Sequence, residues 1–105
     1  KLLTHIEQEK PFLDPDLTLR SLASQINIHP NKLSWLINEI HEQNFNQFIN
    51  KHRIEHFKEL ALDPNNSLFS LLGLAYESGF NSKTVFNTYF KKATGFSPKA
   101  WIEKQ

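Results

Sequence analysis

Apolar residues recur at helical spacing along the whole chain. No segment alternates apolar and polar residues with the two-residue period of a half-buried strand. The sequence therefore predicts an all-α fold of about seven helices. We expect these helices at residues 2–9, at about 18–26, 30–40, 46–62, 70–78 and 82–93, and in a short segment that begins at Pro98.

Several expected helix ends carry residues that favour the start of a helix. Thr18 and Ser82 can cap the free N–H groups of a first turn, and either Ser67 or Ser70 can do so for the fifth helix. Pro30 suits the first turn of the third helix, where its missing N–H costs little.

The spacing of apolar residues also predicts which side chains face the interior. The expected inward residues are Leu33, Leu36, Ile37 and Ile40 in the third helix, Phe48, Ile49, Phe57, Leu60 and Ala61 in the long one, and Phe86, Tyr89 and Phe90 in the sixth. At 1.5 Å per residue, the long helix can span roughly 25 Å.

The two halves of the chain contain an internal repeat. Residues 22–28 match residues 74–80 at an offset of 52, and one extra residue in the second turn makes the offset 53 from there on. The later pairs are Leu33 with Phe86, Leu36 with Tyr89, and Ile37 with Phe90. Each copy has a short helix, a tight turn and a second apolar-striped helix, which is the helix-turn-helix pattern.

One such pattern is weak support, because any helical hairpin can imitate it. Two patterns in register, joined by a helix of suitable length, can enter successive major grooves one turn of B-DNA apart. We therefore expect a first helix-turn-helix subdomain at residues 1–45, a linker helix at 46–62 and a second helix-turn-helix subdomain at 63–105.

Composition and charge narrow the possible functions. With 39% hydrophobic and 22% charged residues the chain is typical of globular proteins, and no apolar run approaches the roughly 20 residues needed to span a bilayer. The absence of cysteine excludes a disulfide framework and a cysteine zinc site. The formal net charge is only +1, but residues 80–105 hold five lysines and one acid, a net +4. This basic quarter suits a nucleic-acid partner.

The chain resembles the DNA-binding domain of the AraC/XylS family of transcription regulators. The matching residues are Leu17-Thr18-Leu19, Leu22-Ala23, Leu33-Ser34, Leu36, Phe45, Phe48-Ile49, Arg53-Ile54-Glu55, Lys58-Glu59-Leu60, Leu74-Ala75, Gly79-Phe80, Ser82, Phe86, Phe90-Lys91-Lys92 and Gly95-Phe96-Ser97-Pro98. Three residues depart from the family: Trp35 replaces a frequent Arg, Ile37 a common Phe, and Glu42 a usual Gly. The resemblance implies that Arg53 braces the two units through a carboxylate or carbonyl, with phosphate binding as the alternative.

The resemblance also bears on the parent protein. The chain lacks methionine and begins inside a helical pattern, so we expect a fragment of a longer protein. Two runs, at residues 44–46 and 71–82, are similar to Bacteroidetes-type members, some of which follow a membrane region. The expected partners are double-stranded DNA and RNA polymerase. We expect a cytoplasmic, nucleoid-associated location and a monomeric fragment, and we consider both dimerisation and membrane attachment of the parent through a preceding region.

Outward residues of the second helix in each unit are the candidates for contact with DNA, because a recognition helix buries one stripe and presents the other. The candidates for base contact are Asn31, Ser34 and Trp35 in the first unit and Lys83, Thr84, Asn87 and Thr88 in the second. The candidates for phosphate contact are Lys32, Asn38, Ser82, Lys91, Lys92, Ser97 and Lys99. Asn can pair with adenine and Lys with guanine or phosphate. Trp35 has the alternative interpretation of a partly exposed packing residue.

The sequence also contains features of two other classes of function. Residues 52–56 spell the H-x-x-E-H pattern of inverted zinc peptidases, with His52 and His56 one helical turn apart. A catalytic zinc also needs a third ligand and a cleft, so we expect no enzyme activity, metal site or cofactor. The second alternative is a protein-interaction module that docks a partner through Phe12, Trp35 and Trp101.

Overall fold

The computed structural model describes residues 1–105, and every regular element in it is helical. The α-helices are α1 (Leu2–Glu9), α2 (Leu19–Gln25), α3 (Pro30–His41), α4 (Phe45–Leu62), α5 (Leu71–Glu77), α6 (Lys83–Thr94) and α7 (Pro98–Glu103). Short 3-10 turns, η1 (Pro11–Leu13) and η2 (Pro64–Asn66), follow α1 and α4. The predicted all-α fold with seven helices is confirmed. No helix combines the length and apolar character that crossing a membrane requires.

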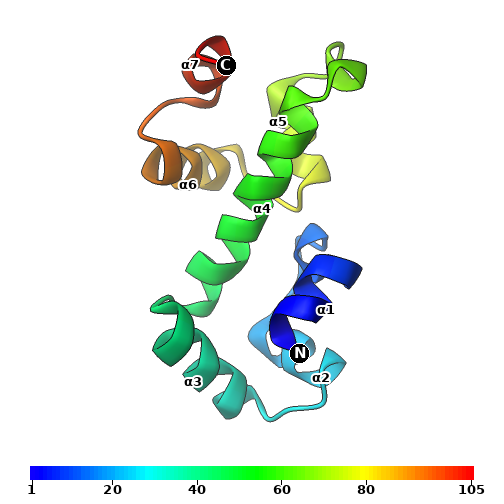
Figure 1. The fold of residues 1–105 in the computed structure, drawn as a ribbon, viewed down its shortest axis with the longest axis vertical. Coiled ribbons are helices and arrows are strands. Elements are labelled where there is room, and N and C mark those ends of the chain that lie inside the picture. Colours follow the sequence, from blue (N-terminus) through cyan, green and yellow to red (C-terminus); the bar gives the residue numbers. More distant parts are fainter.

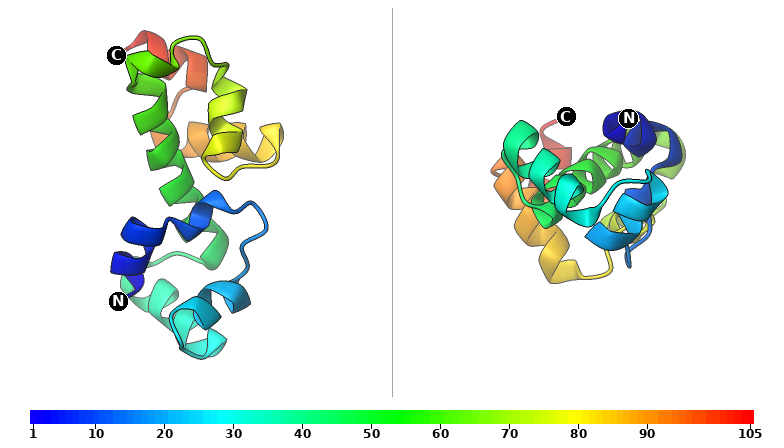
Figure 2. Two further views of the ribbon diagram at one scale, coloured as in Figure 1. Left: turned by 90° about the vertical axis from the view of Figure 1, so that its right-hand side faces the viewer. Right: turned by 90° about the horizontal axis from the view of Figure 1, so that it is seen from below.

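Helix α4 is the axis of the molecule (Figure 1). It has 18 residues, and α1, α2 and α3 lie around its first half while α5, α6 and α7 lie around its second half. The molecule is elongated accordingly, with extents of 42 × 25 × 21 Å (Figure 2).

Two separate hydrophobic cores lie along this axis. The first contains ten buried residues, eight from α1, η1, α2, α3 and the start of α4, with Leu17 and Ile26 on either side of α2. The second contains seven, six from the rest of α4, α5 and α6, with Phe80 from the turn between α5 and α6. Helix α4 supplies Phe48 and Ile49 to the first core and Ile54 and Phe57 to the second. Because one continuous helix belongs to both cores, neither unit can turn about α4 without exposing apolar surface.

Most predicted helix ends are confirmed, including the caps. The side chains of Thr18 and Ser82 accept hydrogen bonds from backbone N–H groups of their helices, and Ser70, not Ser67, caps α5. The linker helix begins at Phe45, one residue before the expected start, because Asn44 and Gln47 form a reciprocal capping box.

The predicted inward position of Ile40 is wrong, because its side chain is 64% exposed. In the last turn of α3 the inward place belongs to His41, whose ring lies 5.0 Å from that of Phe48. Leu60 and Ala61 are only half-buried, because they lie at the edge of the second core where α4 ends.

Arg53 of α4 ties the linker helix to the first unit. Its buried guanidinium donates from Nε to the carbonyl oxygen of Phe12 at 2.7 Å, from Nη2 to that of Asp14 at 2.9 Å, and from Nη1 to Asn50 Oδ1 at 2.9 Å. The turn of the second unit reaches the same place, since a Cβ on Gly79 would lie 2.8 Å from Arg53 Nε. The expected contact of Arg53 with a carbonyl is confirmed for the first unit, and its contact with the second unit is the packing of Gly79 and Phe80 against the guanidinium.

Phe12 is the side chain through which η1 packs on α4. Its ring lies 5.9 Å from the imidazole of His52 and 5.8 Å from that of His56, so the two histidines flank it. Burial is the main cause that lowers the pKa of both imidazoles below the usual 6.5. Around His52, Lys51 and His41 act in the same direction and Glu55 and Glu7 oppose it; around His56, Lys10 lowers the pKa and Glu59 raises it.

Replacing Gly79 with alanine should destabilise the fold far more than the same change at Gly95. Both glycines have positive φ, at 105° and 81°, so alanine costs about 1–2 kcal/mol of backbone strain at either position. At Gly79 the new Cβ would also overlap the carbonyl oxygen of Phe12, whereas at Gly95 it meets nothing within 4 Å. We expect a loss of about 3 kcal/mol or more for Gly79→Ala. Urea unfolding of the two variants measures the difference, and equal losses would contradict this packing.

The stability of the fold should fall as pH drops through about 6.5, because the unfolded chain takes up protons on His52 and His56 before the folded protein does. Above that pH both states hold neutral imidazoles, and the contribution of these groups to stability is fully present. Urea unfolding at a series of pH values between about 5 and 8 measures the effect. A variant in which glutamine replaces both histidines should lose most of this dependence. An unchanged slope would contradict the burial of the two rings.

Candidate nucleic-acid interface

The internal repeat of the sequence is a repeat of backbone geometry. Ile28 N–H donates to the carbonyl oxygen of Ala23 at 3.1 Å, and the equivalent Phe80 N–H donates to that of Ala75 at 3.2 Å. The turns place Asn27 and Gly79, also 52 residues apart, in conformations with φ of 57° and 105°. Because the two turns use the same backbone bond and a residue with positive φ at the same position, α2–α3 and α5–α6 are two copies of one helix-turn-helix unit.

The copies stay in register along their second helices. Leu33 and Ile37 of α3, and the matching Phe86 and Phe90 of α6, are all buried. Each helix also ends on a residue in the left-handed conformation, at Glu42 and at Gly95. In Figure 1 both second helices lie on the same side of α4. Their unburied faces are thus available to one extended ligand.

The exposed face of α3 carries every candidate of the first unit. Asn31, Lys32, Trp35 and Asn38 are exposed and Ser34 is half-buried. Trp35 is 57% exposed, which leaves its indole largely outside the core. Asn38 Nδ2 donates to the carbonyl oxygen of Ser34 at 2.9 Å, so this amide is oriented by its own helix.

The exposed face of α6 carries the candidates of the second unit. Lys83, Thr84, Asn87, Thr88, Lys91 and Lys92 are all exposed. Asn87, Thr88, Lys91 and Lys92 line one shallow polar concavity. Neither Asn87 nor these two lysines makes a side-chain hydrogen bond or salt bridge within the protein. Their polar groups are thus free for a ligand.

The remaining candidates lie at helix starts or on α7. Ser82 Oγ accepts a hydrogen bond from Val85 N–H at 3.2 Å, and Ser97 Oγ accepts one from Ala100 N–H at 3.2 Å. Both serines therefore cap helices, and each hydroxyl proton remains available to a ligand. Lys99 is exposed on α7.

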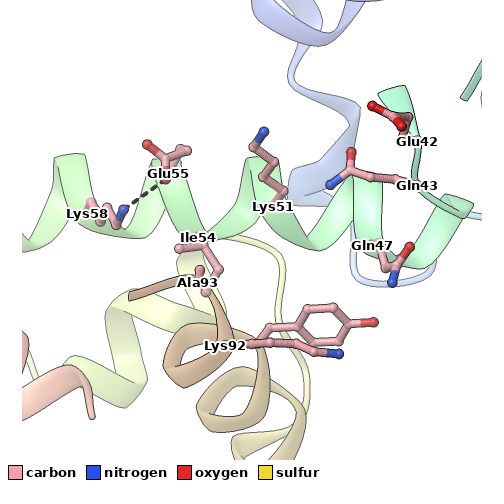
Figure 3. A pocket seen from close by; sticks show the side chains of 10 residues that line it. Glu42, Gln43, Gln47, Lys51, Ile54, Glu55, Lys58, Lys92 and Ala93 are labelled. Carbon is pink, nitrogen blue, oxygen red and sulfur yellow. Dashed lines mark hydrogen bonds and ion pairs between the residues drawn. The ribbon is translucent and has the colours of Figure 1, made fainter. Parts of the chain in front are cut away.

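The structure adds a groove that the sequence did not reveal (Figure 3). We call it the linker groove; it is lined by the turn after α3, one face of α4 and one face of α6, and its volume is about 390 Å³. Among its lining residues are Gln43, Gln47, Lys51, Lys58, Tyr89 and Lys92. The spacing of Gln47, Lys51 and Lys58 places them on one side of a helix. This spacing is the only feature of the sequence that points to the groove.

The two histidines of the H-x-x-E-H pattern are engaged with Phe12 rather than with each other or a third ligand. No group of three or more His, Cys, Asp or Glu side chains is arranged to hold a metal ion. Of the aromatics considered for protein docking, Phe12 is buried and Trp101 is half-buried against Phe90 at 5.7 Å. Trp35 is the only one of the three that is exposed, and it lies on α3.

Comparison with known proteins identifies the family. A family model described as a helix-turn-helix domain matches residues 22–104. The melibiose operon regulatory protein of Escherichia coli K12 is 27% identical over 88 residues, which cover 84% of this chain and 28% of that protein. The chain thus spans less than a third of the length of this relative.

Solved structures agree on the fold. The C-terminal domain of AraT, a response regulator from Geobacillus stearothermophilus, is 29% identical with a TM-score of 0.73, covering 99% of this chain and 85% of that one. A DNA-binding transcriptional dual regulator from Escherichia coli K-12 is 22% identical with a TM-score of 0.80, covering 99% and 93%, and shows the fold alone. With most of its length matched by the family model, the chain belongs to the AraC-type helix-turn-helix family, the DNA-binding domains of transcription regulators.

Proposed function

We propose that this chain binds double-stranded DNA sequence-specifically by inserting α3 and α6 into two successive major grooves. The observation that carries the proposal is the repeat of one helix-turn-helix geometry on both halves of a single rigid helix, with both second helices on one side. Dimeric helix-turn-helix proteins reach two grooves with two chains. Here one chain supplies both units, which supports binding as a monomer.

The proposed base contacts come from the N-terminal halves of the exposed faces. In the first unit they are Asn31, Ser34 and Trp35, and in the second they are Lys83, Thr84, Asn87 and Thr88. A free Asn amide can form two bonds with adenine, and Trp35 can contact a thymine methyl group. Asn87 is the strongest candidate, because it is exposed and its amide is unpaired within the protein.

The proposed phosphate contacts surround these positions. They are Lys32, Asn38, Ser82, Lys91, Lys92, Ser97 and Lys99. Lysines at the edge of the interface attract any DNA sequence, and the serines add hydrogen bonds from capped helix starts. Four of these seven residues are lysines, and three of those lie after residue 79, so we infer that the second unit supplies most of the affinity.

For the parent protein we propose transcription regulation together with RNA polymerase, at the nucleoid, and no catalytic activity. The support is membership in a family of DNA-binding regulators and the names of the relatives. We propose that the signal, dimerisation and any membrane attachment of the parent lie outside this domain, which spans 28% of the curated relative's length.

Footprinting on a selected binding site should show protection over about two helical turns of DNA, because two recognition helices one turn apart each cover a major groove. Sites can be selected from random duplexes with the isolated domain. Protection confined to one major groove would contradict the use of both units.

Replacing Asn87 with alanine should cost about 1–3 kcal/mol of binding free energy at one base position and relax specificity there. Lys92→Ala is the matched comparison, and it should weaken binding to all sequences alike. Titration of the selected duplex, its single-base variants and random DNA measures both effects. An equal loss on selected and random DNA for Asn87→Ala would refute a base-reading role.

A further inference from the structure

The linker groove lies between the two faces assigned to the major grooves. One wall is the turn that follows α3, the other wall is α6, and α4 forms the floor between them (Figure 3). The groove contains none of the proposed base-contacting residues. Of the proposed phosphate-contacting residues, only Lys92 lines it.

The exposed face of α6 continues into this groove, and the end of α3 borders its other side. On α6, Lys92 follows Thr88 by four residues, and it lines both this groove and the concavity that holds Asn87 and Thr88. On the other side, Glu42 is the residue that ends α3. Both Glu42 and Lys92 line the groove. A duplex held by both recognition helices would therefore border the groove between its two contacts.

The charges in the groove favour an anion. Lys58 is neutralised by Glu55 at 3.0 Å, which is the one salt bridge of the molecule. Lys51 on the floor and Lys92 on the wall have no carboxylate partner, and Glu42 is the one remaining acid. The groove thus presents two unpaired ammonium groups against one exposed carboxylate.

Neutral groups in the groove complement these cations. Gln47 Oε1 accepts a hydrogen bond from Asn44 N–H at 2.9 Å, which leaves both N–H bonds of that amide free to donate. Gln43 adds a second amide. Ala93 adds a small exposed apolar surface that suits the carbon face of a sugar.

We propose that the linker groove binds the sugar-phosphate backbone that borders the minor groove between the two major-groove contacts, with Lys51 and Lys92 as its cations and Gln43 and Gln47 as donors. In B-DNA the minor groove, about 6 Å wide, separates successive major grooves on one face of the duplex. The inference rests on the proposed function. It adds Lys51, Gln43 and Gln47 to the contacts and makes α4 part of the DNA-binding surface.

Lys51→Gln tests the proposal, with Lys1→Gln as a control that removes the same charge from the end of α1, outside the groove. Binding to the selected duplex is measured as a function of salt. Each lost phosphate contact lowers the slope of log affinity against log salt by about 0.9. The ratio of Lys51→Gln Kd to wild-type Kd should therefore shrink by about 3.5-fold between about 50 and 200 mM salt, while Lys1→Gln follows the wild type.

Glu55→Gln should change the affinity for DNA in the opposite direction to Lys51→Gln. Removing this carboxylate frees Lys58 for phosphate, so binding should tighten and the salt slope should steepen. Ethylation of the phosphates that border the central minor groove should weaken binding of the wild type and have a smaller effect on Lys51→Gln. These phosphates lie between the footprints of α3 and α6.

Several outcomes would overturn the proposal while leaving the two recognition helices intact. One is a Lys51→Gln salt slope equal to that of the wild type, together with protection of both major grooves. Another is binding of inorganic phosphate that Lys51→Gln abolishes without any change in DNA binding, which would assign the groove to a small anion. If instead the footprint covers a single major groove, the proposed function itself fails. The footprint therefore distinguishes failure of the groove proposal from failure of the proposed function.

Discussion

The structure depends on one buried cation. The guanidinium of Arg53 lies at the middle of α4, and burial lowers its pKa, although an arginine stays charged at any physiological pH. A buried charge is tolerated only when its donors are satisfied, and here two backbone carbonyls of the first unit and the side chain of Asn50 accept from it. Since Gly79 of the second unit packs on the same spot, Arg53 joins the first unit, the linker helix and the second unit.

This junction matters because a protein that reads two grooves needs its two units at a fixed spacing and angle. Helix α4 fixes the spacing by its length, and its share in both cores fixes the rotation of each unit about it. Two units held rigidly at the separation of their sites gain affinity, because the second contact follows the first without further loss of freedom. The length of the linker helix thus sets the distance between the two units, and in our proposal the groove along it is a third surface for the same duplex.

The two units share a backbone and differ in surface chemistry. Four of the five residues with positive φ match in position, and one pair combines Asn27 with Gly79 and the other Glu42 with Gly95. At both positions the second unit has glycine and the first unit has a residue with a side chain. Only at Gly79 does a neighbouring backbone leave no room for a Cβ. The lysines, in contrast, are concentrated in the second unit. The two units therefore share a fold but differ in surface charge.

The sequence by itself determined the helices, most of their caps, the repeat and the exposed faces of α3 and α6. These features depend on residues within a few positions of one another, for which apolar spacing and capping preferences are sufficient. The tertiary structure decided which carbonyls Arg53 binds, that His41 rather than Ile40 faces inward, and that Lys51 and Lys92 line one groove. These pairings join residues up to 41 positions apart, or depend on where a neighbouring helix ends, and only packing brings such groups together.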